Sequence, residues 1–390
     1  MGFLSGRVTF TRFRVAGPAP GMFGPEHLER LEKLAAGRKS LRSGDGVEVG
    51  WTAGDHILDT RFRLEKNVVN ESLHFALRVD AQKIPADLLR AYYQIELEGR
   101  SARNPSGLPS AKQKRDAKDA AVARIEQEAK DGRFIKRKAV PVMWDARSNE
   151  LLVGTTAVTP IEQLFSLFER TFECGFEAIT AGRQAFHLAE LHGQTRGVDD
   201  SSPSPFVPEL SPKELAWIPD EDSRDFLGNE FLLWLWHHLD TASDSVAGAD
   251  KSEITVMLSR TLTLECPRGQ TGHETISHEA PARLPEARRA IQAGKLPRKA
   301  GLTIVRHDKQ YSLTLHAETL AVSGCKMPPA EEGEVGDARA RLDARVDQVR
   351  HLVETLDLLY DAFIRLRCGS KWDQELAKMQ KWLRSEEKRR

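Results

Sequence analysis

The sequence predicts an α+β protein with mixed or antiparallel sheets, packed helices, two sheet-containing lobes and a projecting helical finger. Short runs of alternating apolar and polar residues occur in both halves of the chain, as expected for half-buried strands. Helical patterns lie between them in no regular strand–helix repeat, which argues against a parallel α/β fold. One long basic segment, residues 101–139, has few large apolar residues to bury, so we expect it to project from the sheets.

Length and charge limit the kinds of partner that the chain can attract. Its 390 residues, 40% of them hydrophobic, are enough for two or three domains with substantial cores. The formal net charge is +0, so no global field draws the protein to nucleic acid or to a membrane. Any such attraction must come from local patches.

Cysteine usage and apolar runs indicate a cytoplasmic protein. Cys174, Cys266, Cys325 and Cys368 lie far apart without metal-ligand spacing, which argues against a zinc site or a disulfide scaffold. The N-terminus has neither a long apolar core nor a cleavage site, so we expect no signal peptide. The longest apolar cluster, 231–236, is far shorter than the roughly 20 residues of a membrane span. We therefore expect no membrane partner.

The first predicted domain comprises residues 1–100 and 140–195. Alternation predicts its strands, and apolar residues at three- and four-residue spacing predict its helices. Turn residues such as Gly17–Pro20 separate these elements. The expected strands are 3–15, 47–51, 59–64, 72–79, 140–145 and 150–156, and the expected helices are 26–34, 85–97 and 161–172.

The second half is predicted to contain a connector, a second sheet and C-terminal helices. Residues 196–222 are rich in proline and are expected to form an extended connector. Residues 223–330 are expected to form the second sheet domain, and 337–390 the C-terminal helices with a basic tail. The expected strands are 254–258, 260–265, 302–306 and 311–316, and the expected helices are 225–239, 284–293 and 338–366.

The basic segment is the main candidate for function. Residues 101–138 hold 11 Lys and Arg against 5 Asp and Glu in a chain that is neutral overall. A projecting basic helix can neutralise the phosphates of a nucleic acid, although a solvated helix face explains the same charges. Phe134 at its end is either an exposed contact or a core aromatic. The candidate DNA-binding residues here are Lys112, Lys114, Arg115, Lys118, Arg124, Arg133, Phe134, Lys136, Arg137 and Lys138.

The second domain adds five candidates. Arg268 and Gln270 lie in a glycine-containing turn whose amides can approach phosphate, although it lacks the spacing of a nucleotide-binding loop and a plain hairpin turn explains it too. Lys295, Arg298 and Lys299 follow a predicted helix C-terminus. Cations are favoured there in any case, so the helix dipole explains this cluster as well as DNA does.

Enzymatic interpretations find weaker support. His187 and His192 are five residues apart, not the four that place two ligands on one helix face. The adjacent pair His237–His238 has no glutamate placed as in a zinc protease. Asp145 and Glu150 could hold magnesium for a nuclease, or serve as turn residues of a tight hairpin. We identify no catalytic constellation, and we expect no metal and no cofactor.

The order of elements resembles the bacterial recombination-associated protein RdgC family. The resemblance covers most of the chain and is most specific around residues 75–175. It departs in inserted material around 181–222 and in a tail after about 370. The passages that carry it are the strand Phe3–Phe13, Gly50-Trp51, the run Leu77–Pro85 with its Lys-Ile-Pro, Arg133-Phe134, Trp144-Asp145 with its partner strand from Asn149, the helix 161–172, and Glu286–Lys295 before a strand.

This resemblance implies a non-enzymatic, ring-shaped homodimer that binds duplex DNA without sequence preference and restrains recombinase filaments. It implies roles in DNA recombination, repair and replication, and a nucleoid location in the cytoplasm. Phe134 matches the aromatic residue at the foot of the family's finger, and Arg268 with Gln270 falls where the family has a polar, DNA-facing turn. The alternatives from other classes are a metal-dependent DNA-processing nuclease and a protein-interaction scaffold without a DNA role.

Overall fold

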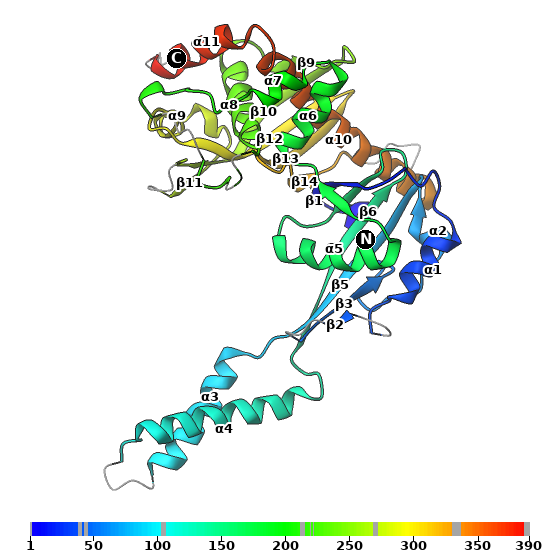
Figure 1. Cartoon of the computed structure of the whole chain (residues 1–390), viewed down its shortest axis with the longest axis vertical. Helices are drawn as coiled ribbons and strands as arrows, with labels where there is room; N and C mark the ends of the chain where they lie inside the picture. Colours follow the sequence, from blue (N-terminus) through cyan, green and yellow to red (C-terminus); the bar gives the residue numbers. More distant parts are fainter. Residues whose placement is uncertain are drawn as a thin grey trace.

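The chain forms two lobes joined by one continuous antiparallel sheet, and a helical finger extends from one end of that sheet (Figure 1). This computed structural model describes residues 2–37, 41–42, 46–102, 107–210, 215–218, 220, 222–267, 272–329 and 337–385. The α+β class predicted from the sequence is confirmed.

The sheet runs through the whole molecule, and every pairing of its named strands is antiparallel. The short strands β4 (Val68–Val69), β8 (Phe176–Ala178) and β9 (Ser245–Ala247) pair with β5, β1 and β10 at its margins. In order across the sheet the strands are β11 (His273–His278), β10 (Glu253–Glu265), β12 (Leu296–Arg306), β13 (Lys309–His316), β14 (Val322–Lys326), β1 (Val8–Val15), β7 (Glu150–Val153), β6 (Ile135–Asp145), β5 (Ser72–Gln82), β3 (Val47–Thr52) and β2 (Leu41–Arg42).

Strand β1 is the junction between the two lobes. Its first half pairs with β14 through Val8 and Phe10, and its second half pairs with β7 from Thr11 to Arg14. One strand therefore contributes to both sheets, and the lobes share backbone hydrogen bonds instead of being linked by a flexible connector.

The N-terminal lobe packs two helices on one face of β3, β5, β6 and β7. These are α1 (Pro25–Lys33) and α5 (Val158–Phe172), with the short α2 (Leu64–Asn67) at the margin. The core is aromatic: Trp144 lies in edge contact with Phe23 and Phe172. The buried Trp51 donates to Thr171 Oγ1 at 2.8 Å, so its indole N–H is satisfied inside the core.

The C-terminal lobe covers only one face of its sheet with helices. Helix α8 is buried on all sides, because it lies between the sheet and the other helices of this lobe. Its Gly228 allows the close approach, since a Cβ there would lie 1.9 Å from the Ala317 carbonyl oxygen. The helices are α6 (Ala181–Leu191), α7 (Thr195–Asp199), α8 (Phe226–Thr241), α9 (Pro285–Gln292), α10 (Ala338–Arg367) and α11 (Trp372–Arg384), with 3-10 turns at Gly2–Leu4, Pro208–Leu210 and Pro281–Arg283.

Two strand predictions are corrected by the structure. Residues 59–64 form no strand, because buried Asp59 binds Lys66 Nζ at 2.6 Å and the Arg61 amide, which folds the segment into a turn before α2. The two strands expected within 254–265 are one strand, β10, with a bulge at which Arg260 has a φ of 68°. A bulge shifts the register and explains why the alternation looked interrupted.

The structure also moves the predicted domain boundaries. The buried side chains of Val198, Phe206 and Leu215 belong to the core of the C-terminal lobe, so the described part of 196–222 is packed and is not an extended connector. Helix α6, which the sequence had assigned to the first domain, lies in the same core. Phe3 joins the same core from the other end of the chain. The finger starts with α3 (Ala86–Ser101), which the sequence had assigned to the first domain. No helix among the described residues is long and apolar enough to cross a bilayer.

We predict that Arg12→Met strongly destabilises the protein. Arg12 is 1% exposed and binds Glu150 at 3.0 Å and Asp357 at 2.7 Å, so its removal leaves Glu150 buried without its counter-ion. The expected loss is about 3–5 kcal/mol in the free energy of unfolding, measured by urea titration. Arg14→Met, on the same strand and less buried, is the control, with an expected change within about 0.5 kcal/mol. Equal losses in both variants would contradict this role of Arg12.

A second prediction concerns pH. Burial, together with nearby positive charges such as that of Arg350, lowers the pKa of His74 to about 3. The unfolded chain therefore binds a proton between pH 6.5 and 3 that the folded chain does not, so stability falls as pH falls through this window. Between pH 7 and 5 the contribution of His74 is about 2 kcal/mol. In urea titrations, the free energy of unfolding of His74→Gln should depend less on pH by this amount. If its pH dependence equals that of the wild type, groups other than His74 cause it.

Candidate nucleic-acid interface

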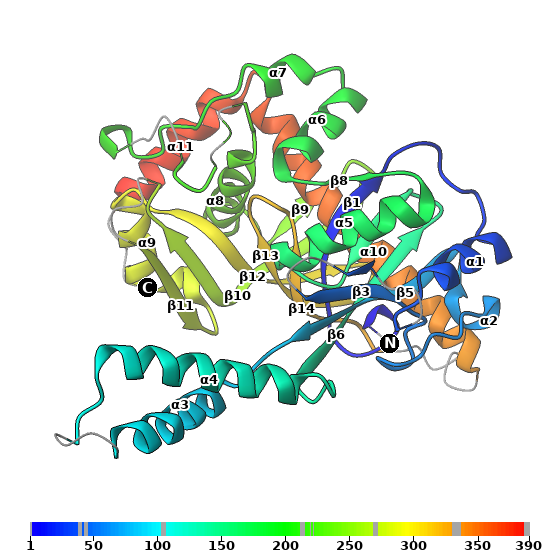
Figure 2. The same cartoon turned by 60° about the horizontal axis from the view of Figure 1, so that its bottom comes forward.

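The finger is a helical hairpin of α3 and α4 (Ala111–Ala129) that projects on a two-stranded ribbon (Figure 1). Strands β5 and β6 leave the N-terminal lobe together and form the ribbon, in which Val79–Gln82 pairs with Ile135–Lys138. Seen from a second direction, the finger lies on the same side of the N-terminal lobe as the C-terminal lobe (Figure 2). The molecule therefore has an open side between the finger and that lobe.

Small side chains let the two helices of the finger pack closely. Ala117, Ala121, Ile125 and Ala129 recur every four residues on α4 and are buried, and α3 is the helix that α4 contacts. Helix α4 has few large apolar residues. Alanines supply the buried stripe instead, and their small volume allows the helix axes to approach.

Polar contacts fix the two ends of the hairpin. Tyr92 on α3 donates to Glu128 Oε1 at 2.7 Å, and the Arg124 guanidinium lies 4.1 Å from the centre of the Tyr92 ring. At the other end, Ser110 and Gln113 form a capping box that begins α4. The finger is therefore an ordered element that can hold its cations at fixed positions.

Six of the predicted residues on the finger and ribbon are exposed cations for which the described residues supply no ion pair. An unpaired exposed cation is free to neutralise a phosphate without losing an interaction inside the protein. They are Lys112, Lys114, Arg115 and Lys118 in the first half of α4, and Lys136 and Lys138 on β6.

Lys136 and Lys138 lie on the same face of the ribbon, because alternate residues of a strand point the same way. Arg137 points to the opposite face, where its Nε lies 3.4 Å from Asp80. Asp80 also binds Arg78 at 2.5 Å, so this carboxylate is shared by two arginines. The ribbon thus carries a net positive charge on both faces.

Arg133 and Arg124 are engaged within the finger. Arg133 lies 2.6 Å from Asp131 and 3.4 Å from Glu128, and its side chain is 52% exposed. Ion pairs at this level of exposure are weak because water screens them, so Arg133 can exchange Asp131 for a phosphate. Arg124 is held by Tyr92 and lies 3.8 Å from Glu128, which gives it a structural role in the hairpin.

Phe134 lies half-buried in the turn between α4 and β6. Its carbonyl oxygen accepts from the Lys83 amide at 2.9 Å, which extends the pairing of the ribbon by one step. It is neither fully exposed nor a core residue, so both interpretations offered for it stay open. Its backbone contributes to the foot of the finger in either case.

Two of the three cations predicted around the start of β12, Lys295 just before it and Arg298 on it, are held inside the C-terminal lobe. Lys295 is 7% exposed and binds Glu274 at 2.9 Å. Arg298 binds Glu265 at 2.5 Å and Glu318 at 2.6 Å and lies over the Trp217 ring. These contacts give both residues a structural role, and their predicted contact with DNA stays a prediction.

Lys299 is exposed on the open face of the sheet, the face that no helix of the lobe covers. Thr263 on β10 and His316 on β13 are its partners on the neighbouring strands. Burial lowers the pKa of His316 to about 4, with Lys299 and Arg298 adding to the effect, so this histidine is neutral at pH 7. The other two predicted residues, Arg268 and Gln270, lie outside the described residues.

The open face that carries Lys299 also carries a row of hydroxyl groups, which the sequence did not predict. Further along the same strands, Ser259, Thr303 and Ser312 form a chain of side-chain contacts of 3.1 and 3.4 Å across three strands. The signal was present in residues 310–316, where polar residues alternate with Tyr311, Leu313 and Leu315. Such hydroxyls can bond phosphate oxygens without reading the base sequence.

The enzymatic alternatives find no organised site in the described part of the chain. Asp145 binds Arg350 at 2.8 Å and accepts from the Arg147 amide, which makes it a turn residue. Glu150 is bound by Arg12, so neither carboxylate is free for magnesium. His192 contacts Asp361, His238 contacts the Ser245 carbonyl oxygen, and no group of three or more potential metal ligands occurs among the described residues.

Comparison with known proteins adds no family assignment. No protein-family profile and no curated protein matches the chain. The resemblance to the RdgC family therefore stays a prediction. Evidence for function comes from the finger, the ribbon and the open face of the C-terminal lobe.

We predict that Ala121→Leu loosens the finger. Ala121 is completely buried between the helices, so a larger side chain must push them apart at a cost of about 1–3 kcal/mol. Amide hydrogen exchange in α3 and α4 should accelerate while exchange in the C-terminal lobe is unchanged. Ala123→Leu, on the exposed face of α4, is the matched control and should leave exchange as in the wild type. Unaltered protection in Ala121→Leu would show that the helices do not pack through this residue.

Proposed function

We propose that this chain is a non-enzymatic protein that binds duplex DNA without sequence preference through its finger and ribbon. The observation that carries the proposal is the group of six unpaired, exposed cations on a rigid projecting element, Lys112, Lys114, Arg115, Lys118, Lys136 and Lys138. In a chain with a formal charge of +0, this local excess is a feature of one element and not of overall composition.

The type of contact favours the phosphate backbone over the bases. Lysines make point-charge contacts with phosphates, whereas base recognition needs planar groups fixed at a groove edge. Lys299 and the hydroxyl groups on the same face of the sheet extend the same chemistry to the open face of the C-terminal lobe. A duplex lying along the open side between finger and lobe would meet both sets (Figure 1).

We further propose that the protein acts as a homodimer. A single copy presents its cations from one side only, and two copies would surround a duplex and double the number of phosphates neutralised. Two large apolar residues of the finger, Ile95 at 55% and Leu108 at 72% exposure, are suited to contact between fingers. Analytical ultracentrifugation tests this part, because a monomer at DNA-binding concentrations would refute it.

Occupation of duplex DNA by such a protein would limit the access of recombinases, so we propose that it modulates recombination in the nucleoid. This follows from sequence-independent coverage and needs no catalytic step. The nuclease alternative is disfavoured because Asp145 and Glu150 are each held by an arginine. Incubation of duplex DNA with the protein and Mg²⁺ distinguishes the two, since cleavage would support the nuclease.

We predict that Lys136→Ala with Lys138→Ala weakens DNA binding and its dependence on salt. Each phosphate contact contributes about 0.9 to the slope of log affinity against log salt for duplex DNA, so losing two should reduce the slope by about 1.8. The measurement is fluorescence anisotropy with a labelled random-sequence duplex over a salt series without metal.

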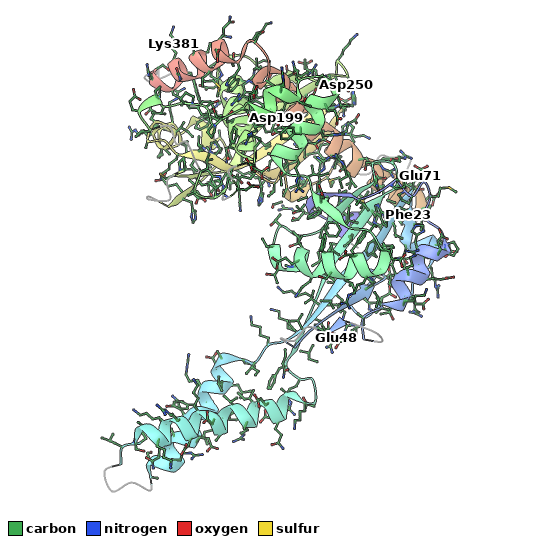
Figure 3. The ribbon with its side chains drawn as sticks, in the orientation of Figure 1. Phe23, Glu48, Glu71, Asp199, Asp250 and Lys381 are labelled. Carbon is green, nitrogen blue, oxygen red and sulfur yellow. The ribbon has the colours of Figure 1, made fainter. Side chains whose placement is uncertain are left out.

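The matched control is Lys378→Ala with Lys381→Ala on α11, which removes the same charge far from the finger (Figure 3). It should bind as the wild type does. Equal losses in both double variants would show only a dependence on net charge and would refute the finger as the binding element.

A further inference from the structure

The side of the molecule opposite to the open side carries a cleft of about 800 Å³ between the lobes. Its walls come from α10, from the β6–β7 hairpin and from the end of α6. Glu71 and Asp250, which lie beside this cleft on the two lobes, are both at the edge of the molecule away from the finger (Figure 3). The volume is in the range of about 300–1,000 Å³ that is usual for ligand sites.

The lining of the cleft is acidic. It holds six carboxylates against three cations, Arg147, Lys309 and Arg350. Three further arginines, Arg12, Arg306 and Arg365, pair with these carboxylates and neutralise part of the excess. Four of the acids are spaced along α10, and the other two flank the β6–β7 turn. The six acidic residues are Asp145, Glu150, Asp347, Glu354, Asp357 and Asp361, and together with the apolar side chains described below they define the acidic cleft.

In two places, one arginine is shared by two carboxylates of the cleft. Arg12 lies 3.0 Å from Glu150 and 2.7 Å from Asp357. Arg350 lies 2.8 Å from Asp145 and 3.2 Å from Asp347. Each group of three keeps one negative charge, because a single guanidinium neutralises only one carboxylate.

A third shared arginine lies at the rim. Arg306 lies 2.9 Å from Glu354 and 2.6 Å from Asp250, with 60% of the Glu354 side chain exposed. Deeper in, Asp361 is 4% exposed, and its Oδ2 accepts no hydrogen bond although Arg365 lies 3.0 Å away. The exposed carboxylate of Glu354 at the rim can therefore accept from a cationic donor outside the protein, whereas Asp361 at the floor is already paired with Arg365.

The same cleft has an apolar strip. Leu152 and Leu188 lie at its floor, and Val349, Val353 and Leu358 lie along α10. Leu191, at the end of α6, is 68% exposed and forms part of the wall. Neither a metal ion nor solvent would remove the apolar surface of this leucine from water. The aliphatic part of a basic side chain, or an apolar side chain of a ligand, would bury it.

We propose that the acidic cleft is a docking site for a basic, amphipathic peptide segment of a partner protein. Lysine or arginine head groups would bind the carboxylates, and apolar residues at helical spacing would cover Leu191 and its neighbours. A duplex is excluded as occupant because its phosphates would meet the excess of carboxylates. The site lies away from the finger, so it leaves the proposed DNA-binding side free.

The test is binding of a fluorescein-labelled dodecapeptide of lysine and leucine at helical spacing to the full chain. We expect Asp347→Lys with Glu354→Lys to weaken binding at least tenfold, since both side chains are more than half exposed at the rim. Leu191→Ser should weaken binding about threefold or more without changing charge. The matched control is Glu162→Lys with Glu169→Lys on α5, which changes the net charge equally outside the cleft and should bind as the wild type does.

Three results would overturn the proposal. The first is equal weakening by the α5 control, which would show attraction to net charge alone. The second is full competition by spermine together with no effect of Leu191→Ser, which would identify a site for small cations. The third is peptide binding by Asp347→Lys with Glu354→Lys as tight as that of the wild type, which would place the peptide outside the acidic cleft. If DNA does not bind at all, peptide binding still tests the acidic cleft, so the failure of one proposal is distinguishable from failure of the other.

Discussion

The placement of Arg12 between Glu150 and Asp357 is the interaction on which the architecture depends. It lies on β1, the strand that both lobes share, and it binds a residue of the N-terminal lobe and a residue of α10 at the same time. Burial lowers the pKa of the guanidinium, and the two carboxylates reverse this, so that the pKa of Arg12 is raised and the charge is permanent. Because water is excluded from this site, the ion pairs are stable only in a well-defined geometry. That geometry fixes the angle between the lobes.

Helix α10 extends that constraint along the junction. Arg345 binds the carbonyl oxygen of Phe3 at 3.0 Å, Arg350 binds Asp145, and Arg367 binds Glu230 at 2.6 Å. With 30 residues the helix is about 45 Å long, which is enough to contact both lobes. Two arginines that attach this helix to the sheet, Arg12 and Arg350, are each shared by two carboxylates, so part of the negative charge is not neutralised. The acidic cleft is therefore a consequence of how the lobes are joined.

The two proposed sites use opposite charges on opposite sides of a neutral chain. Six cations of the finger and ribbon have no ion pair among the described residues, whereas Lys295 and Arg298 are paired with Glu265, Glu274 and Glu318. Because of this separation, one molecule can bind a polyanion and a basic peptide without either ligand being repelled by a surface of like charge. A rigid junction is needed for such an arrangement, and Arg12 with α10 supplies it.

The sequence alone determined the α+β class, most helices and strands, and the basic segment, because these depend on local periodicity and composition. It missed that 254–265 is one bulged strand, that the described part of 181–222 joins a core, and that α3 belongs to the finger, since each depends on what packs against the segment. Only the tertiary structure decided which cations lack an ion pair among the described residues. In the sequence, Lys136 and Lys299 lie in short basic clusters, as Lys295 and Arg298 do. Ion pairing is a property of neighbours far along the chain, so no local pattern could reveal it.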